Sequence, residues 1–433
     1  MNNIQAKGYT GFPEWLPAAK RVENEILETI KSVYESYGYT PIETSAVEKI
    51  EHLTSSTGDV SKEIYGIHRL AGESSEKFGL HFDQTLPLAR YTANNANNLH
   101  FPFKRYQIQK VWRGERPQAG RFREFYQADI DIVGDETLAL HYEAEVIEVI
   151  YNLFSKLNIG KFKIKVNNRK LLEGLYKSQG IENLNEVLII IDKIDKIGAE
   201  KVIELLKETG LNNEQAEFCT EIASKKFTKN DSFDYLNSIE DTNEMLIQAK
   251  LELTSIFKNL EHLPDDCIIF DLSIARGLDY YTGSVYECEL EGLEKFGSVC
   301  SGGRYDNLAE KFTKRKLPGV GLSIGVTRLL YLLFKNEIIK ESENTPTKAL
   351  VIIFDEAQRP SCNKIAADLR SNGIPTEVSP DVKKFPKQIK FAERRGASFI
   401  IIPEQNGDVN MKNIKTGDQE PLNYEKITSF LNT

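Results

Sequence analysis

The sequence predicts an α+β fold: an antiparallel sheet flanked by helices, interrupted by a helical insertion and followed by a C-terminal α/β domain. Three observations support this prediction. In residues 105–134, two runs of alternating character flank a loop containing Pro117 and Gly120, which is the pattern of an antiparallel hairpin. Residues 167–262 change to helical periodicity. After residue 348, short apolar runs alternate with helical segments, as in α/β domains.

Composition restricts the class of protein. The chain has 433 residues, 40% apolar and 27% charged, which is enough for two or three globular domains with their own cores. Its start lacks an apolar signal region, and no apolar run is long enough to cross a bilayer, so we expect a cytoplasmic protein with no membrane partner. The net charge of -9 argues against nonspecific polyanion binding over the whole surface but leaves room for a local basic patch.

Neither cysteine nor histidine spacing indicates a metal site. The five cysteines form no CxxC pair, and the six histidines form no HExxH motif. We therefore expect no metal held by cysteine or histidine clusters and no disulfide framework.

The first part of the chain predicts helices around extended segments. Residues 18–37 have apolar side chains at helical spacing and end at Gly38, and residues 39–47 are expected to be extended. A long helix is predicted for about residues 138–157.

Residues 80–90 are expected to bring a carboxylate and a hydroxyl together. We predict that Asp83 and Thr85 share one face of a strand, before Pro87 introduces a helix.

The hairpin is predicted to have one polar and one apolar face. Side chains alternate along a strand, so Arg113 and Glu115 share a face of the first strand. On the second strand, the polar face carries Arg121, Arg123, Phe125, Gln127, Asp129 and Asp131, and the apolar face Phe122, Tyr126, Ala128, Ile130 and Ile132. The polar face would suit a multiply charged anion, a flat ring and a small polar molecule. For an arbitrary hairpin, a solvated sheet face is the commoner explanation.

The middle of the chain predicts an inserted helical subdomain at residues 167–262, without convergent catalytic residue types. Extended segments return at residues 267–289 and 297–307. Residues 317–333 are a glycine-rich stretch that runs into an apolar helix bearing Arg328.

Two motif matches in this glycine-rich stretch are rejected. Gly319, Gly321 and Gly325 do not complete GxGxxG, and no βαβ unit surrounds them. The residues around Ser323 fit the GxSxG pattern of hydrolases, but that order needs a downstream histidine and the last one is His262. We therefore expect neither a dinucleotide site nor a covalent serine mechanism.

The C-terminal segment predicts a small α/β domain with mainly parallel strands at residues 349–354 and 398–402. Helices are expected around residues 362–369 and 387–394. The second helical region is rich in basic residues: Lys383, Lys384, Lys387, Lys390, Arg394 and Arg395. Taken alone, such a cluster is more often a solvated face, but in this acidic protein it is the best candidate for contacting a phosphate backbone.

These blocks resemble the histidyl-tRNA synthetase family of class II aminoacyl-tRNA synthetases. The hairpin is similar to the second motif of that class, with Arg113, Glu115 and Phe125 at its characteristic positions, and GVGLSIGVTRLL is similar to the third, with Arg328. ARGLDYYTGSVYE and SGGRYDNL resemble blocks particular to the histidine enzymes. The resemblance covers nearly the whole chain.

Four positions depart from the commonest pattern of the family. Ser45 stands where the first motif usually has a proline, and His81 where an arginine is common. Asp83 and Asp131 replace the glutamates of many bacterial members, as in eukaryotic and archaeal members.

The resemblance implies a division of the chain into five segments and a homodimer. The segments are residues 1–166, the first part of the catalytic domain with motifs 1 and 2; 167–262, the helical insertion; 263–338, the second part with the histidine-specific blocks and motif 3; 339–347, a linker; and 348–433, a C-terminal α/β anticodon-binding domain.

The resemblance also implies a two-step reaction. The carboxylate of L-histidine attacks the α-phosphate of ATP to give histidyl-adenylate and pyrophosphate, and a terminal ribose hydroxyl of tRNA(His) then takes the histidyl group. Neither step needs an enzyme nucleophile, because the first depends on in-line positioning and on positive charge near phosphorus. ATP is expected to bring Mg²⁺.

Residue roles follow from the same resemblance. Arg113 and Arg276 would be catalytic and bind the α-phosphate and the amino acid. The other ATP-binding residues would be Arg121 and Arg328 for the β- and γ-phosphates, Phe125 for stacking on adenine and Glu115 for its amino group. For histidine, Asp83, Thr85 and Gln127 would take the α-ammonium, Asp131 and Tyr281 would address the ring, and Tyr280 and Tyr305 would line the pocket. For tRNA, we assign Arg116, Gln118, Lys383, Lys384, Lys387 and Lys390.

Alternatives stay open at this stage. Arg276 and Asp131 could form an ordinary buried ion pair. The chain could be a histidine-binding regulatory paralogue without charging activity, although such paralogues usually lack the terminal domain and lose arginines equivalent to Arg113 and Arg328. It could also be another class II synthetase, such as the glycine, threonine or proline enzyme, but RGLDYYTG and Asp131 argue against that.

Overall fold

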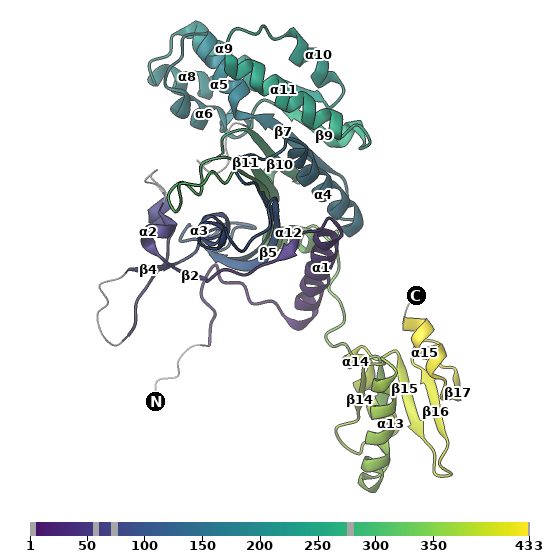
Figure 1. Cartoon of the computed structure of the whole chain (residues 1–433). Coiled ribbons are helices and arrows are strands. Elements are labelled where there is room, and N and C mark those ends of the chain that lie inside the picture. Colours follow the sequence, from purple (N-terminus) through teal and green to yellow (C-terminus); the bar gives the residue numbers. More distant parts are fainter. Residues whose placement is uncertain (1–5, 55–59, 71–76, 275–280, 432–433) are drawn as a thin grey trace. The chain divides into compact units, whose positions relative to one another are not determined.

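The computed structural model describes residues 6–54, 60–70, 77–274 and 281–431. The chain forms two compact units, one comprising the residues before 15 together with residues 25–339, and the other residues 15–24 and those from 340 onwards. Figure 1 labels the elements of both. Within the described ranges, no helix is long and apolar enough to span a membrane.

A nine-stranded sheet forms the centre of the first unit, in the order β1-β5-β6-β12-β11-β10-β7-β9-β8. The strands are β1 (Thr40–Pro41), β5 (Phe103–Trp112), β6 (Glu124–Val133), β7 (Phe162–Asn168), β8 (Lys226–Thr228), β9 (Ile268–Asp271), β10 (Ser284–Leu290), β11 (Cys300–Tyr305) and β12 (Gly319–Gly325). Every pairing from β5 across to β7 is antiparallel, which confirms the predicted sheet type. The β1–β5 and β7–β9 pairings are parallel.

Helices pack on both sides of the main sheet, including the apolar face of β6. On β6, Ala128, Ile130 and Ile132 are fully buried, and Tyr34 of α1 (Pro17–Ser36) donates to the carbonyl of Ala128 at 3.1 Å. Figure 1 shows α4 (His141–Leu157) and α3 (Thr85–Asn95) on opposite sides of the sheet. The helix α12 (Val326–Lys335) begins directly where β12 ends. The predicted helices at residues 18–37 and 138–157 are thus confirmed.

The prediction for residues 80–90 is wrong in part. A small sheet of β2 (Val47–Lys49), β4 (Phe78–Leu80) and β3 (Gly66–Ile67) ends before Asp83, so Asp83 and Thr85 do not lie on a strand. The Asp83 carboxylate instead accepts a hydrogen bond at 3.2 Å from the backbone N–H of Leu86, in the first turn of α3, whose N-cap residue is Gln84. The helix therefore starts at Thr85, and Pro87 falls in its first turn, where a missing N–H is harmless.

The inserted subdomain is mainly helical, as predicted, and lies in the upper part of Figure 1. Its helices are α5 (Arg169–Ser178), α6 (Leu184–Ile191), α7 (Ile194–Ile197), α8 (Ala199–Glu208), α9 (Asn213–Ala223), α10 (Asp231–Ser238) and α11 (Glu244–Asn259). It also contributes β8, which pairs with β9 at the edge of the main sheet. The insertion is therefore joined to the sheet by backbone hydrogen bonds as well as by packing.

The second unit contains a five-stranded sheet in the order β14-β13-β15-β16-β17. Its elements are β13 (Ala349–Val351), α13 (Arg359–Ser371), β14 (Thr376–Val378), α14 (Phe385–Arg395), β15 (Phe399–Pro403), β16 (Val409–Asn413), β17 (Gln419–Pro421) and α15 (Tyr424–Leu431). Side chains of α13 join a buried cluster with Val351 and Met411, and those of α14 join another with Leu350 and Ile400. Because successive residues of a strand face opposite ways, these helices cover opposite faces of the sheet.

The prediction of mainly parallel strands in this unit is wrong in part. The β13–β14 and β13–β15 pairings are parallel, but the β15–β16 and β16–β17 pairings are antiparallel. Short turns connect the latter strands, and Gly407 and Gly417 adopt positive φ angles of 91° and 81° in them. Such short connections can join only antiparallel strands.

Candidate active site

Two adjoining cavities lie over the polar face of the main sheet. The first, of about 190 Å³, is lined by Asp83, Thr85, Arg113, Gln127, Asp129, Asp131, Tyr281, Ser301, Tyr305, Gly321, Leu322 and Ser323. The second, of about 220 Å³, is lined by Arg113, Glu115, Gly120, Arg121, Phe122, Phe125, Gln127, Ser298, Val299, Cys300, Ser301, Ser323, Gly325 and Arg328. Both share Arg113, Gln127, Ser301 and Ser323. Two ligands, one in each cavity, would therefore meet at these four residues.

The first cavity gathers three buried carboxylates. Asp83, Asp129 and Asp131 are each at most 3% exposed. Burial, the largest cause, raises the pKa of Asp83 and Asp131 to about 6 and that of Asp129 to about 7. A positively charged ligand group would offset the cost of burying these charges.

A fully buried arginine pairs with one of these acids. Arg105 of β5 stands opposite Asp131 in the β5–β6 pairing, and its Nη2 lies 2.5 Å from Oδ2 of Asp131. Oδ1 of Asp131 accepts a hydrogen bond from the hydroxyl of Tyr305 at 2.6 Å. Arg105 and Tyr305 both lower the pKa of Asp131 and so favour its charged form, although burial outweighs them.

Two glycines make room for this arrangement. A Cβ built at Gly321 would lie 2.0 Å from Oδ1 of Asp131, and one at Gly319 would lie 2.3 Å from the ring of Tyr305. A side chain at either position would therefore displace the Asp131–Tyr305 pair. The glycines of β12 serve close packing beneath the cavity, not a nucleotide-binding turn.

Ser323 is engaged in hydrogen bonds within the sheet. Its hydroxyl donates to Oδ1 of Asp129 at 2.5 Å, and its oxygen accepts from Nε2 of Gln127 at 2.9 Å. Ser323 lies in the middle of β12 and not at a turn between strand and helix. This geometry agrees with the rejection of a serine nucleophile.

The second cavity combines arginines with an aromatic ring. The guanidinium of Arg113 lies 5.2 Å from the ring centroid of Phe125, and its Nε donates to the carbonyl of Phe82 at 3.1 Å. Nη1 of Arg121 lies 3.7 Å from the Glu115 carboxylate. Arg328 donates to the carbonyl of Phe296, and burial, followed by repulsion from Arg121, lowers its pKa.

The loop of the hairpin departs from the predicted alternation. The strands end at Trp112 and begin again at Glu124, so Arg113, Arg121 and Phe122 lie outside them. Phe122 consequently lines the second cavity instead of the apolar face, and its ring packs edge-on against Tyr331 of α12. Gly120, with φ at 76°, makes the turn that brings Arg121 back toward the cavity.

The structure brings together most of the predicted site residues. Around the first cavity lie Asp83, Thr85, Arg113, Gln127, Asp131, Tyr281 and Tyr305, and around the second Arg113, Glu115, Arg121, Phe125 and Arg328. Arg276 and Tyr280 lie outside the described residues. Arg116 and Gln118 are exposed in the hairpin loop, and Lys383, Lys384, Lys387 and Lys390 are exposed at and before α14.

Sequence reasoning missed four polar residues at this site. Asp129 was placed on the polar face without a role, and Ser323 was considered only as a nucleophile. Ser301 and the buried Arg105 were not singled out. A partial signal for Arg105 lies in the pattern of β5, because Arg105 alternates with Gln107 and Gln109 and so shares one face of the strand with them.

Comparisons with known proteins agree with this geometry. The family model for histidyl-tRNA synthetase matches residues 11–329, and a model for an anticodon binding domain matches residues 348–433. A histidine–tRNA ligase of Bifidobacterium animalis subsp. lactis is 45% identical over 97% of this chain and 96% of its own length. One from Cutibacterium acnes is 43% identical over 95% and 94%. The crystal structure of histidyl-tRNA synthetase from Nostoc sp. PCC 7120 superposes with a TM-score of 0.90 at 37% identity, covering 99% of this chain and 100% of that one.

Proposed function

The chain belongs to the histidyl-tRNA synthetase family, and on that premise we propose that it is a histidine–tRNA ligase that activates L-histidine with ATP and transfers it to the 3′ end of tRNA(His). The observation that carries the proposal is the pair of adjoining cavities. One is lined by acids and tyrosines that suit an amino acid with a polar ring, and the other by arginines and Phe125, which suit ATP.

In the first cavity, the roles follow from the chemistry of histidine. Asp83, Thr85 and Gln127 take the α-ammonium, whose N–H groups need acceptors. Asp131, held by Arg105 and Tyr305, takes a ring N–H together with Tyr281. Because these buried groups would be left unpaired beside an apolar side chain, the pocket should reject apolar isosteres on the order of ten-thousand-fold without editing.

In the second cavity, the residues suit a bent triphosphate. Phe125 stacks on adenine while Glu115 accepts from its amino group, and Arg121 and Arg328 hold the β- and γ-phosphates. Arg113 lines both cavities, so its guanidinium can bind the α-phosphate next to the attacking carboxylate. Positive charge fixed at that point stabilises the charge that builds up at phosphorus, which is the main requirement of the first step. Arg276 is assigned to the same group, although it lies outside the described residues.

In this proposal, Mg²⁺ binds together with ATP and is not held permanently by the protein. Among the described residues, no group of three histidine, cysteine or carboxylate side chains could hold a metal ion. Mg²⁺ usually keeps several waters and binds substrate phosphates, where it neutralises their charge. The arginines and the Glu115 carboxylate that line the second cavity fit an ion bound mainly by phosphates and water.

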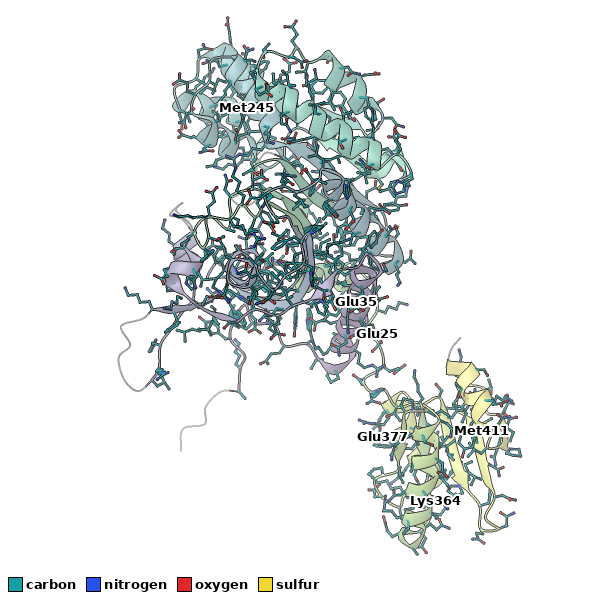
Figure 2. All side chains as sticks on the ribbon, in the orientation of Figure 1. Glu25, Glu35, Met245, Lys364, Glu377 and Met411 are labelled. Carbon is teal, nitrogen blue, oxygen red and sulfur yellow. The ribbon has the colours of Figure 1, made fainter. Side chains whose placement is uncertain are left out.

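The terminal unit and the hairpin loop are assigned to tRNA. Lys383, Lys384, Lys387 and Lys390 are exposed, and Arg116 and Gln118 are exposed beside the second cavity. Reversing charge at Lys387 and Lys390 should raise the tRNA concentration needed for charging without changing adenylate formation. Lys364→Glu is the control, because Lys364 is exposed on α13 on the other face of this sheet (Figure 2).

The proposal includes a homodimer that works in the cytoplasm, where tRNA and ATP are available. The resemblance of the chain to its family supports both points. Light scattering on the purified chain tests the dimer, and a single mass matching one chain would refute it.

The first experiment is ATP–pyrophosphate exchange with each of the twenty amino acids supplied singly. Exchange with histidine alone would support both activation and specificity, and charging of tRNA(His) would complete the test. Exchange with glycine, threonine or proline instead would point to another class II enzyme. Binding of histidine without any exchange would favour the regulatory paralogue, against which Arg113, Arg328 and the anticodon-binding match already argue.

A further inference from the structure

The first cavity contains a chain of two hydrogen bonds that ends at a carboxylate. Ser323 donates to Asp129 at 2.5 Å, and Nε2 of Gln127 donates to the Ser323 oxygen at 2.9 Å. Ser323 stands directly opposite Asp129 in the β6–β12 pairing, and Gln127 lies two residues from Asp129 on the same face. The sheet backbone therefore keeps these three side chains next to one another.

The carboxylate fixes the direction of both hydrogen bonds. An ionised carboxylate only accepts, so the Ser323 hydroxyl has to give its one proton to Asp129. The Ser323 oxygen can then act only as an acceptor, and it takes an N–H of the Gln127 amide. The amide oxygen of Gln127 is left pointing elsewhere.

The described residues supply no hydrogen-bond donor to that oxygen. Oε1 of Gln127 is buried and has no hydrogen-bond partner within the described ranges, and the same holds for Oδ2 of Asp83 in the same cavity. Burying an acceptor without a partner costs free energy, so these two atoms indicate a ligand with several N–H donors. An ammonium group has three.

We propose that Asp129 is a positioning residue for the amino group of the substrate: through Ser323, it turns the Gln127 amide so that its oxygen, and not its NH₂, faces the α-ammonium. This inference rests on the proposed function, because it takes an amino acid as the occupant of the first cavity. Asp129 need not touch the substrate in this role. Its effect is to set the polarity of a group that does.

Protonation of Asp129 would reverse the chain. A carboxylic acid can donate to Ser323, whose proton then points to Gln127 and turns the amide NH₂ toward the ammonium. The charged or titratable groups around Asp129 are Arg105, Asp131, Asp83, Tyr34, Cys300 and Tyr281. Burial raises the pKa of Asp129 to about 7, with Arg105 and the Ser323 hydrogen bond opposing it. Histidine binding should therefore weaken as the pH falls through about 7.

Asp129→Asn is the central test, measured as the KM for histidine and for ATP in pyrophosphate exchange. Asparagine keeps the shape but permits the reversed chain at every pH. The expected result is a histidine KM raised by roughly 10- to 100-fold, the cost of one mispaired buried group, with the KM for ATP unchanged. The variant should also lose the part of the pH dependence that wild type shows near neutrality.

Two further variants frame this result. Asp129→Glu keeps an acceptor that cannot donate when ionised, so it should recover part of the lost histidine affinity. Asp135→Asn is the matched control, because Asp135 lies just beyond β6 and pairs with Arg315 away from both cavities. It should leave both KM values unchanged.

Imidazolepropionate, which is histidine without the α-amino group, separates positioning of the amine from general damage to the cavity. Its inhibition constant should be the same for wild type and Asp129→Asn. If it weakens as much as histidine, Asp129 does not act through the amine and the inference is overturned. An unchanged histidine KM in Asp129→Asn overturns it as well.

Calorimetry with histidine and the full chain keeps this inference distinct from the proposed function. If wild type binds histidine without exchange, the ligase function fails, and the Kd of Asp129→Asn still decides the role of Asp129. If the wild type neither binds histidine nor supports pyrophosphate exchange, both proposals are refuted. Should Asp129→Asn not fold, Ser323→Ala interrupts the same chain, and equal rises in the KM for histidine and for ATP would count against the inference.

Discussion

Two arginine–carboxylate pairs of the first unit, each with a buried carboxylate, differ in how completely their hydrogen bonds are satisfied. Behind the first cavity, Nη2 of Arg105 lies 2.5 Å from Asp131, but its Nε and Nη1 have no hydrogen-bond partner among the described residues. Away from it, Arg304 lies 2.9 Å from Glu143 and its Nε donates to Asp306 at 2.9 Å. Glu143 also accepts hydrogen bonds from the hydroxyls of Ser284 and Tyr286.

The difference indicates that the Arg304–Glu143 and Arg105–Asp131 pairs serve different purposes. Around Glu143, each charge has protein partners, so that cluster is complete without a ligand. Around Asp131, Oδ2 of Asp83 and Oε1 of Gln127 have no hydrogen-bond partner within residues 6–54, 60–70, 77–274 and 281–431. A buried polar cluster that is left incomplete costs stability and is retained where a ligand completes it. We therefore expect changes in the two clusters to affect different measurements.

The largest effect is expected for Asp131→Asn. This change removes the charge opposite the histidine ring and takes from the buried Arg105 the carboxylate that lies 2.5 Å from its Nη2. The KM for histidine should rise by roughly 100-fold or more, the scale for a buried charge that loses its partner. The KM for ATP should change far less, because Asp131 does not line the second cavity. Equal increases in both constants would argue against Asp131 as the partner of the ring.

Arg304→Met tests the completed cluster. Glu143 would remain buried without its cation, so the free energy of unfolding in urea should fall by about 3–5 kcal/mol. The KM for histidine, measured where the variant is folded, should stay near that of wild type. Adding Glu143→Leu should restore much of the stability, because replacing both partners removes the unpaired charge. A strong loss of histidine affinity would mean that the two clusters are not separate.

Lys229→Met extends the comparison to a cation held by backbone carbonyls. The buried Nζ of Lys229 donates to the carbonyls of Leu260, Glu261 and Leu263 at 3.0, 3.3 and 2.6 Å. Methionine cannot donate to these carbonyls, so the substitution should lower the free energy of unfolding by about 1–3 kcal/mol. The KM for histidine should not change. Lys201→Met is the matched control, since Lys201 is exposed on α8 and should leave the melting temperature unchanged. Equal melting temperatures for both variants would refute this prediction.

Local pattern was enough to predict much of the fold and part of the site. Alternation on β6 placed Gln127, Asp129 and Asp131 on one face and Ala128 and Ile130 on the other, and the structure agrees because this strand is regular. The same rule failed at Phe122, where the chain is a loop. Alternation holds only inside a strand, and the sequence does not show where the strand begins.

Tertiary pairing explains what the sequence could not predict. The role of Arg105 depends on the register that sets it opposite Asp131, and an arginine in a strand is by itself no sign of a buried ion pair. The position of Asp83 depends on its hydrogen bond to the backbone N–H of Leu86, in the first turn of α3. The hydrogen bond between Ser323 and Asp129 joins two residues that are 194 positions apart in the sequence.

The smallest expected effect is a pH dependence of the stabilisation by histidine. Burial raises the pKa of Asp83 and Asp131 from 3.8 to about 6 and that of Asp129 to about 7. Between pH 3.8 and about 7, folded chains thus bind more protons than unfolded chains. The stability these groups contribute is complete below pH 3.8 and is lost as the pH rises through about 6 to 7. The α-ammonium of histidine pairs with the ionised forms and should offset that loss.

Histidine should therefore raise the melting temperature more at pH 8 than at pH 6, with a Kd about tenfold lower at the higher pH. Thermal melting with and without histidine at both pH values provides the measurement. Imidazolepropionate is the control, because its ring titrates in the same range but it brings no ammonium. An equal shift at both pH values would show that the three carboxylates are ionised throughout. The incomplete cluster would then owe its affinity to geometry alone, and the contrast with the Arg304 cluster would lie in hydrogen bonding and not in charge.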